Sequence, residues 1–267
     1  EDIVRAISAE KQEPQWMLDF RLKAYHTYLK MKAPDFGPDL SDLDLERMRY
    51  YIKATDKTYK DWEDVPDDIK NTFDRLGVPQ AERKYLAGAS AQYESEVVYH
   101  NMHDEFEKLG IIFEDMDSAL KDYPDLVKQY FGTLVHPTDN QFAALNSAVW
   151  SGGSFIYVPE GVQTDVPIQS YFRINAENSG QFERTLIIVA PGAHVNYVEG
   201  CTAPSYSSDS LHAAVVEVFV QDVAYRRYTS MQNWSKNVFS SETKRAQAMK
   251  NATTEWADGN LGSKTTT

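Results

Sequence analysis

A repeat of about 31 residues in the second half of the chain is the feature that most restricts its fold. Four segments share an apolar run followed by a short turn and a second run: residues 155–162, 186–193, 217–224 and 246–253. The apolar residues before the turns are Val158, Val189, Val220 and Met249, which are separated by 31, 31 and 29 residues. A near-constant period of this size is typical of architectures in which each repeat buries its apolar face against the next.

The length of the repeat favours a stacked β-solenoid. A propeller blade with four strands requires about 40–50 residues, which is more than this repeat supplies. An antiparallel sandwich with evenly spaced turns is the alternative. We expect the first turns of the solenoid to occupy residues 141–267.

The first half of the chain, residues 1–140, is predicted to be mainly helical, so the expected class is α+β. Apolar residues recur at helical spacing in four places. These are 17–29 after Pro14, 69–76 before Gly77, 94–109 before Gly110, and 118–131 with an interruption near Pro124. Residues 31–44 are rich in Pro, Gly and Asp and are expected to form a loop.

Charge and cysteine content exclude several classes of function. The formal net charge is −13, and such a chain repels phosphate groups, so neither nucleic acid nor a membrane surface is an expected partner. The sequence contains no apolar run of about 20 residues and no recognisable signal peptide. Its single cysteine, Cys201, excludes a disulfide within the chain and favours a cytoplasmic protein.

The phase of the repeat relates Cys201 to other polar residues. Cys201 and Gln232 each lie 12 residues after the last apolar residue of their repeat, so a solenoid would stack them roughly 4.8 Å apart. Gln232 and Trp234 are two residues apart, as are Arg173 and Asn175, and each pair therefore shares one face of a strand. The spacing alone leaves open whether these faces point inward or outward.

Four histidines are candidate metal ligands. His100 and His103 share a face of the predicted helix, but no carboxylate and histidine set with a known ligand spacing accompanies them, so surface or packing roles are favoured. His194 and His212 are possible ligands, although a hydrogen-bonded structural histidine is the simpler interpretation of each. The sequence contains no Walker motif, no Gly-x-Ser-x-Gly and no His-Glu-x-x-His.

Long sequence words resemble the SufB family, the larger scaffold subunits of the SUF system of iron–sulfur cluster assembly. They occur in family order along essentially the whole chain, at residues 77–88, 91–100, 144–153, 169–175, 180–188, 199–204 and 211–217. The resemblance implies a right-handed parallel β-helix after a helical N-terminal region. It also implies that the chain begins part-way into the family's N-terminal region and stops before further β-helix, so that it is truncated at both ends.

The resemblance implies an assembly scaffold and not an enzyme. The implied partners are a SufC-type ATPase, which would supply any ATP hydrolysis, a SufD-type sister subunit, and a sulfur donor linked to a cysteine desulfurase. An iron–sulfur cluster would be held transiently by the full-length complex, and none is expected on this fragment alone. The alternatives are a SufD-type subunit or, from a different class, a β-helix enzyme that acts on polysaccharides.

Cys201 is the residue to which the resemblance assigns sulfur handling, since a thiolate can accept persulfide sulfur or ligate iron. Without the resemblance, a small buried hydrophobic residue would be the simpler interpretation. The resemblance also implies a polar interior lining near the thiol, formed by Arg173, Asn175, Gln232, Trp234 and Lys250. In this hypothesis Arg173 and Lys250 lower the pKa of the thiol, and the other three donate hydrogen bonds to a sulfur species.

Overall fold

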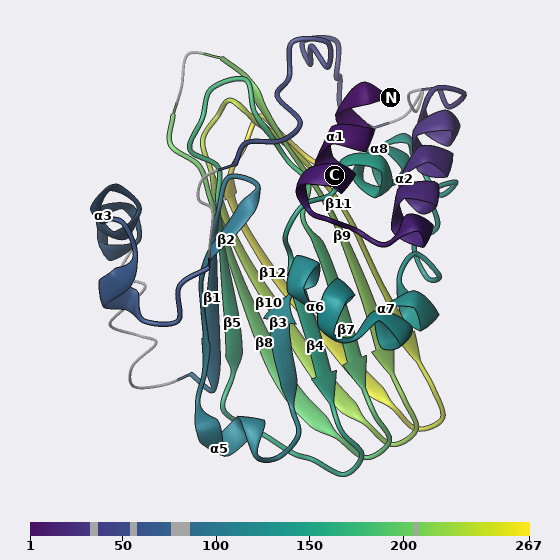
Figure 1. Cartoon of the computed structure of the whole chain (residues 1–267), viewed down its shortest axis with the longest axis vertical. Coiled ribbons are helices and arrows are strands. Elements are labelled where there is room, and N and C mark those ends of the chain that lie inside the picture. Colours follow the sequence, from purple (N-terminus) through teal and green to yellow (C-terminus); the bar gives the residue numbers. More distant parts are fainter. Residues whose placement is uncertain (33–36, 54–57, 76–85, 206–207) are drawn as a thin grey trace.

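The described part of the chain builds two β-sheets that face each other (Figure 1). The structure is a computed structural model that describes residues 1–32, 37–53, 58–75, 86–205 and 208–267. The strands of the first sheet are β1 (Gly88–Tyr93), β2 (Glu96–Met102), β5 (Ile168–Arg173), β8 (His194–Thr202), β10 (Tyr225–Trp234) and β12 (Thr253–Gly262). Those of the second are β3 (Ile112–Asp115), β4 (Ser154–Val158), β7 (Arg184–Val189), β9 (Ser210–Val220), β11 (Val238–Ala248) and β13 (Thr265–Thr266), with β6 (Gly180–Gln181) beside β9.

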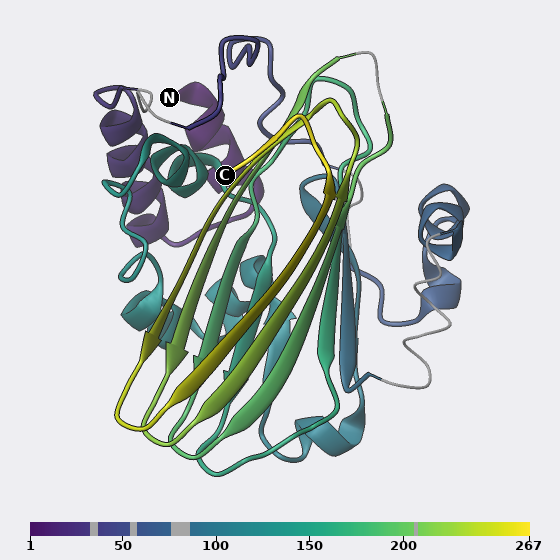
Figure 2. The ribbon, with the colours of Figure 1, turned by 180° about the vertical axis from the view of Figure 1, so that it is seen from behind.

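Successive repeats stack as parallel strands, which confirms the solenoid and excludes the antiparallel sandwich. The chain crosses between the sheets in the pairs β4/β5, β7/β8, β9/β10 and β11/β12, and each strand pairs in parallel with its equivalent in the next turn. The antiparallel pairs among the described strands are β1 with β2 and β3 with β4, at the start of the solenoid. Figure 2 shows the successive turns from behind.

The register of the second sheet corrects one position of the predicted repeat. Val158, Val189 and Val220 are stacked in register, as their 31-residue spacing predicts. The residue opposite Val220 in the last turn is Ala248, and not Met249, which follows the strand and is 48% exposed. The last repeat is therefore shorter by one more residue than the apolar pattern indicates.

Most of the predicted helices are present. The described helices are α1 (Asp2–Glu10), α2 (Gln15–Tyr28), a 3₁₀ turn (Trp62–Asp64), α3 (Asp67–Arg75), α5 (Asp104–Glu107), α6 (Met116–Asp122), α7 (Pro124–Tyr130) and α8 (Gln141–Val149). Helix α2 starts after Pro14, and α6 and α7 are divided before Pro124, as predicted. The predicted end of α3 at Gly77 lies outside the described residues. The described residues of the predicted loop at 31–44 contain neither helix nor strand.

The predicted helix over residues 94–109 is wrong. Residues 96–102 form β2, and only the short helix α5 follows it. The backbone of β2 is hydrogen-bonded to β1 on one edge and to Tyr59 on the other, and Val97 and Val98 are both buried. A strand buried on both faces has an apolar run that periodicity cannot distinguish from a helix. His100 and His103 therefore share no helix face, because His100 lies in β2 and His103 precedes α5.

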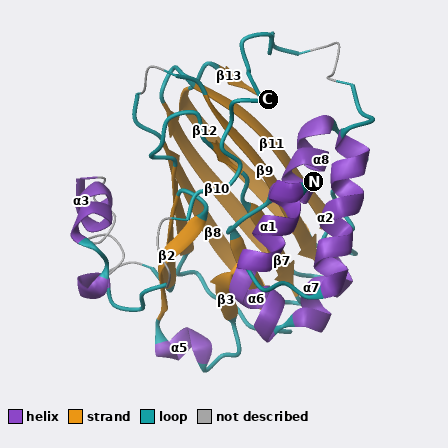
Figure 3. Ribbon diagram, turned by 45° about the horizontal axis from the view of Figure 1, so that its top comes forward, coloured by secondary structure: helices purple, strands orange, loops and turns teal. Residues whose placement is uncertain are grey.

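An apolar core fills one half of the space between the two sheets. Its inward residues come from the strand ends next to the repeated turns and include Ile187, Val189, Val195, Val218 and Val220. A second core lies outside the second sheet, where α1, α2 and α8 cover β9 (Figure 3). Every residue of α8 is buried. None of the described helices is both long and apolar enough to cross a membrane.

A buried ion pair anchors the segment after α7 to the second sheet. Arg184 Nη2 lies 2.9 Å from Glu217 Oε2, and both side chains are 0% exposed. The same carboxylate accepts backbone hydrogen bonds from Gly132, Leu134 and Val135 at 2.8–2.9 Å. Glu217 thus satisfies three amides of a segment that would otherwise lose its contacts with water.

Replacing Glu217 should be strongly destabilising. Glu217→Gln keeps the shape of the side chain but leaves the Arg184 guanidinium without a counter-charge in a dry environment, and the free energy of unfolding should fall by about 3–5 kcal/mol. Urea unfolding measures this change. Asp44→Asn is the control, because it breaks an exposed pair with Arg47 and should leave the midpoint unchanged. Equal midpoints for the two variants would contradict the anchoring role.

Two glycines at either end of β4 separate backbone strain from steric contact. Gly161 has φ +70° and open space where a Cβ would lie, whereas at Gly153, with φ +96°, a Cβ would lie 2.2 Å from the backbone oxygen of Arg184. Gly161→Ala should therefore cost only the left-handed strain of about 1–2 kcal/mol. Gly153→Ala should cost clearly more, since backbone must also move. Thermal unfolding of both variants tests this order, which equal losses would contradict.

Candidate functional site

Cys201 lies on the inner face of β8 and is completely buried. Burial alternates along this strand, with Glu199 and Cys201 on the buried side. The residues opposite Cys201 in the adjacent turns are Phe172 of β5 and Gln232 of β10. The equal offsets of Cys201 and Gln232 within their repeats therefore correspond to neighbouring positions in the parallel ladder.

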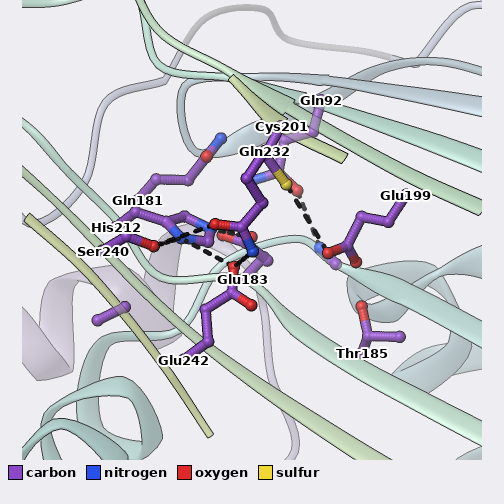
Figure 4. Close-up of polar contacts among 12 residues, drawn as sticks. Gln92, Gln181, Glu183, Thr185, Glu199, Cys201, His212, Gln232, Ser240 and Glu242 are labelled. Carbon is purple, nitrogen blue, oxygen red and sulfur yellow. Dashed lines mark hydrogen bonds and ion pairs between the residues drawn. The ribbon is translucent and has the colours of Figure 1, made fainter. Parts of the chain in front are cut away.

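The second sheet supplies His212 to the same space. His212 comes from β9, Glu242 from β11, and Glu183 from the residues just before β7. The Nε2 atom of His212 donates a hydrogen bond to Glu183 Oε1. Its Nδ1 atom lies 3.3 Å from Glu242 Oε1 and 3.4 Å from Ser240 Oγ (Figure 4). The imidazole ring is thus held between two acidic side chains.

Gln232 connects the two walls of this space. Its side-chain nitrogen donates to Glu242 Oε1. Its carbonyl oxygen accepts from Trp234 Nε1 at 2.8 Å and from Ser240 Oγ at 3.2 Å. Gln232 and Trp234 are both buried, so this pair faces inward.

Glu199 and Lys244 complete the cluster. The Glu199 carboxylate accepts from Tyr228 Oη at 2.5 Å and lies 3.7 Å from the sulfur of Cys201. Lys244 Nζ lies 2.7 Å from Glu242 Oε2 and 2.9 Å from Asp258 Oδ1. We call the buried set around the thiol the polar interior: Glu183, Glu199, Cys201, His212, Gln232, Ser240, Glu242 and Lys244.

The surroundings of Cys201 keep its thiol protonated. Burial raises the pKa of Cys201 well above its ordinary value of 9.0, and the Glu199, Glu183 and Glu242 carboxylates raise the pKa further, while Lys244 opposes them. This direction is opposite to the lowered thiol pKa expected from Arg173 and Lys250. The cation near the thiol is instead Lys244, which no motif in the sequence indicates.

The acidic surroundings also affect the other groups of the polar interior. Burial raises the pKa of Glu199 to about 7. Burial lowers the pKa of His212, but the neighbouring Glu183 carboxylate and its hydrogen bond, with Glu242 and Glu199, raise the pKa above its ordinary value of 6.5. The space around Cys201 therefore contains more negative than positive groups.

Three of the predicted lining residues lie outside the polar interior. Arg173 and Asn175 alternate with the buried residues Phe172 and Ile174 and so lie on the other face of the strand. Arg173 Nη1 donates to Thr202 Oγ1 at 3.1 Å, and the backbone N–H of Asn175 donates to Glu94 Oε1 at 2.7 Å. The interior position expected for them is thus incorrect, because Arg173 lies opposite Thr202, and not Cys201, in the ladder.

Lys250 is also away from the thiol. It lies in the turn between β11 and β12, where its side chain is exposed and its backbone N–H donates to Asp222 Oδ1 at 3.1 Å. His194 lies on the outer face of β8, 3.7 Å from Asp165 and against the Tyr225 ring. Neither residue contributes to the polar interior.

Ligand atoms of the polar interior are close enough to share one ion. Among the described residues, two sets of three have ligand atoms within 4.8 Å of one another: Glu183, Cys201 and His212, and Glu199, Cys201 and Glu242. Both sets include the thiol. Sulfur, nitrogen and oxygen donors together suit transition metals better than Mg²⁺ or Ca²⁺.

The acidic members of the polar interior were missed at the sequence level. Glu199 lies two residues before Cys201, and Glu242 lies two residues after Ser240, so period two places each pair on one face. That signal was available, but the excess of acidic residues in the chain makes any single glutamate resemble part of a solvated surface. Only the packing of one sheet against the other shows that these carboxylates are buried.

Comparisons with known proteins identify the family. Residues 73–170 match the family model described as the SufBD protein N-terminal region, and residues 172–267 match that of the SUF system FeS cluster assembly SufBD core domain. The chain belongs to the SufBD family. An iron–sulfur cluster assembly SufBD family protein of Staphylococcus epidermidis is 61% identical over 266 residues, which are 100% of this chain. The iron–sulfur cluster assembly protein SufB of Bacillus subtilis is 58% identical over 265 residues, or 99% of it.

The chain spans 57% of the length of each of these SufBD relatives. The matched N-terminal region ends within β5, and the core match contains Cys201 and the polar interior. Every member of the polar interior therefore lies in the part of the chain that matches the SufBD core domain.

Burial should protect Cys201 from thiol reagents. In the folded chain, labelling by a disulfide reagent should be roughly 100-fold or more slower than in urea, because a buried and protonated thiol reacts only when the structure opens. The measurement is the labelling rate across a urea series, with a cysteine-containing peptide as the reference for reagent activity. Native labelling as fast as in the unfolded chain would show that the thiol is accessible from solvent.

Proposed function

We propose that this SufBD chain is part of a SufB-type scaffold protein that accepts sulfur on Cys201 during iron–sulfur cluster assembly. The observation that carries the proposal is the position of the single cysteine inside the polar interior. Donors and acceptors from both sheets surround the thiol there, whereas a structural cysteine would require only apolar neighbours. The family match and the name of the B. subtilis relative support the assembly role.

The proposed chemistry is sulfur transfer from a protein persulfide. The sulfur of Cys201 attacks the outer sulfur of the donor persulfide, so that a new S–S bond forms on Cys201 and the S–S bond of the donor breaks. The donor cysteine leaves as a thiolate and takes the proton that Cys201 gives up. No external oxidant or reductant is consumed. Hydrogen bonds from Gln232 and Trp234 lie close by to orient the transferred sulfur.

Partners complete the proposed function. We infer a complex with a SufC-type ATPase and a SufD-type sister subunit, and a sulfur donor linked to a cysteine desulfurase. The chain lacks a Walker motif, so ATP hydrolysis is assigned to the SufC-type partner. The iron–sulfur cluster is the cargo of the full-length complex, held only until transfer.

The alternative functions are less well supported. A polysaccharide-acting β-helix enzyme requires carboxylates that converge on an exposed groove, whereas Glu183 and Glu199 are each 1% exposed and face the inside of the solenoid. A SufD-type subunit shares the fold. The B. subtilis relative with 58% identity is named SufB, which favours the SufB type.

The deciding experiment replaces Cys201 in a full-length SufB-type protein that carries this sequence. Cys201→Ala should reduce the maturation of iron–sulfur enzymes at least tenfold in a strain that depends on this system, because the sulfur acceptor is lost. Val198→Ala, on the outer face of the same strand, is the matched control and should mature enzymes normally. Thermal unfolding of both proteins tests whether each is folded. Normal maturation with folded Cys201→Ala protein would reject the proposal.

A further inference from the structure

We propose that Glu183, Cys201 and His212 form a binding site for one divalent transition-metal ion inside the solenoid. The site would take a first-row ion such as Fe²⁺ or Zn²⁺, which share this ligand chemistry. It goes beyond the proposed sulfur transfer, because it requires no donor protein and can be measured without one.

The geometry of the three side chains supports a single ion. Their ligand atoms lie within 4.8 Å of one another, close to twice the length of a metal–thiolate bond of about 2.3 Å. All three residues are at most 1% exposed and come from three separate segments. A thiolate, an imidazole and a carboxylate on one ion are a common combination for borderline metals such as zinc and ferrous iron.

An unpartnered oxygen points independently to a bound cation. Glu183 Oε1 accepts from His212, but Glu183 Oε2 is buried and has no hydrogen-bond partner among the described residues. A buried carboxylate oxygen without a partner costs about 1–3 kcal/mol or more. Coordination to a cation would remove this cost.

The alternative set around the same thiol has no such unpartnered oxygen. Both Glu199 oxygens have partners, Tyr228 and Cys201. Both Glu242 oxygens are also occupied, Oε1 by Gln232 and Oε2 by Lys244. The set that includes Glu183 is therefore the one with coordination capacity remaining.

The ring of His212 is already oriented for coordination. Its Nδ1 side faces Glu242 Oε1 at 3.3 Å and Ser240 Oγ at 3.4 Å. A carboxylate on the second ring nitrogen is the arrangement that fixes the orientation of metal-bound histidines. Nε2, which faces Glu183, would then be the atom that binds the ion.

The charges of the polar interior favour a cation. Glu183, Glu199 and Glu242 surround the thiol, while Lys244 is shared between Glu242 and Asp258. A divalent ion would offset the excess of negative charge in a dry space. On binding, a metal–sulfur bond forms and the thiol proton is released to solvent, so the step requires no redox partner.

Cobalt(II) is a suitable probe, since thiolate ligation gives a sulfur-to-cobalt absorption band in the near ultraviolet. Cys201 is the single cysteine of the 267-residue chain, so any such band reports this residue alone. Acidic surface groups that bind cobalt give no band. Anaerobic titration of the purified chain should show the band saturating at one cobalt per chain and a rise in unfolding temperature with cobalt concentration.

Matched variants identify the other two ligands. His212→Gln and Glu183→Gln should each weaken cobalt binding at least tenfold. His194→Gln, a histidine outside the set, should leave binding unchanged. A wild-type chain without the band, or a band unaffected by both ligand variants, would overturn the proposal.

X-ray absorption of the wild-type zinc complex keeps the test decisive even where a variant does not fold. The proposal requires one sulfur and at least one imidazole in the first coordination sphere, and a spectrum without imidazole scattering overturns it. Because no sulfur donor is present, these results are independent of the Cys201→Ala maturation assay. Either proposal can therefore fail while the other holds.

Discussion

Backbone hydrogen bonding between parallel strands in register is the constraint on which the rest of this structure depends. It stacks equivalent positions of successive repeats, so that Cys201 of β8 lies opposite Gln232 of β10, and His212 of β9 lies opposite Ser240 of β11. Side-chain alternation then decides which of these residues face each other across the solenoid. The polar interior is thus a consequence of register in two sheets at once, and a slip by one residue in either sheet would turn its members outward.

The repeat period predicted the solenoid because it reflects this stacking directly, and the helical spacing after Pro14 predicted α2. The helix over residues 94–109 could not be distinguished from a strand, because β2 obtains hydrogen bonds on both edges from distant segments. The acidic lining was equally hidden. Glutamates at positions 183 and 199 look like surface residues until the two sheets are packed together.

The outward position of Arg173 could have been inferred from spacing. Repeats of 29 and 31 residues are odd, so residues that stack upon one another alternate between odd and even numbers along the chain. Cys201 therefore stacks with an even-numbered residue in the preceding turn, which is Phe172, and Arg173 must fall on the opposite face. Lys250 differs, because its place in a turn depends on where β11 ends, one residue earlier than the apolar pattern indicates.

The division of the interior into two halves explains how the chain can tolerate its polar site. Three carboxylates, a thiol and a lysine in a low-dielectric space contribute little to stability, because desolvation offsets most of the attraction between them. The apolar core at the other end of the same strands, with Val189, Val218 and Val220, and the helices packed over β9 supply the burial that holds the sheets together. Stability and chemistry therefore lie at opposite ends of the same strands. Because the strands are continuous, the apolar half fixes the spacing and register of the polar half, and a buried thiol is held among charged groups that would not assemble by their own attraction.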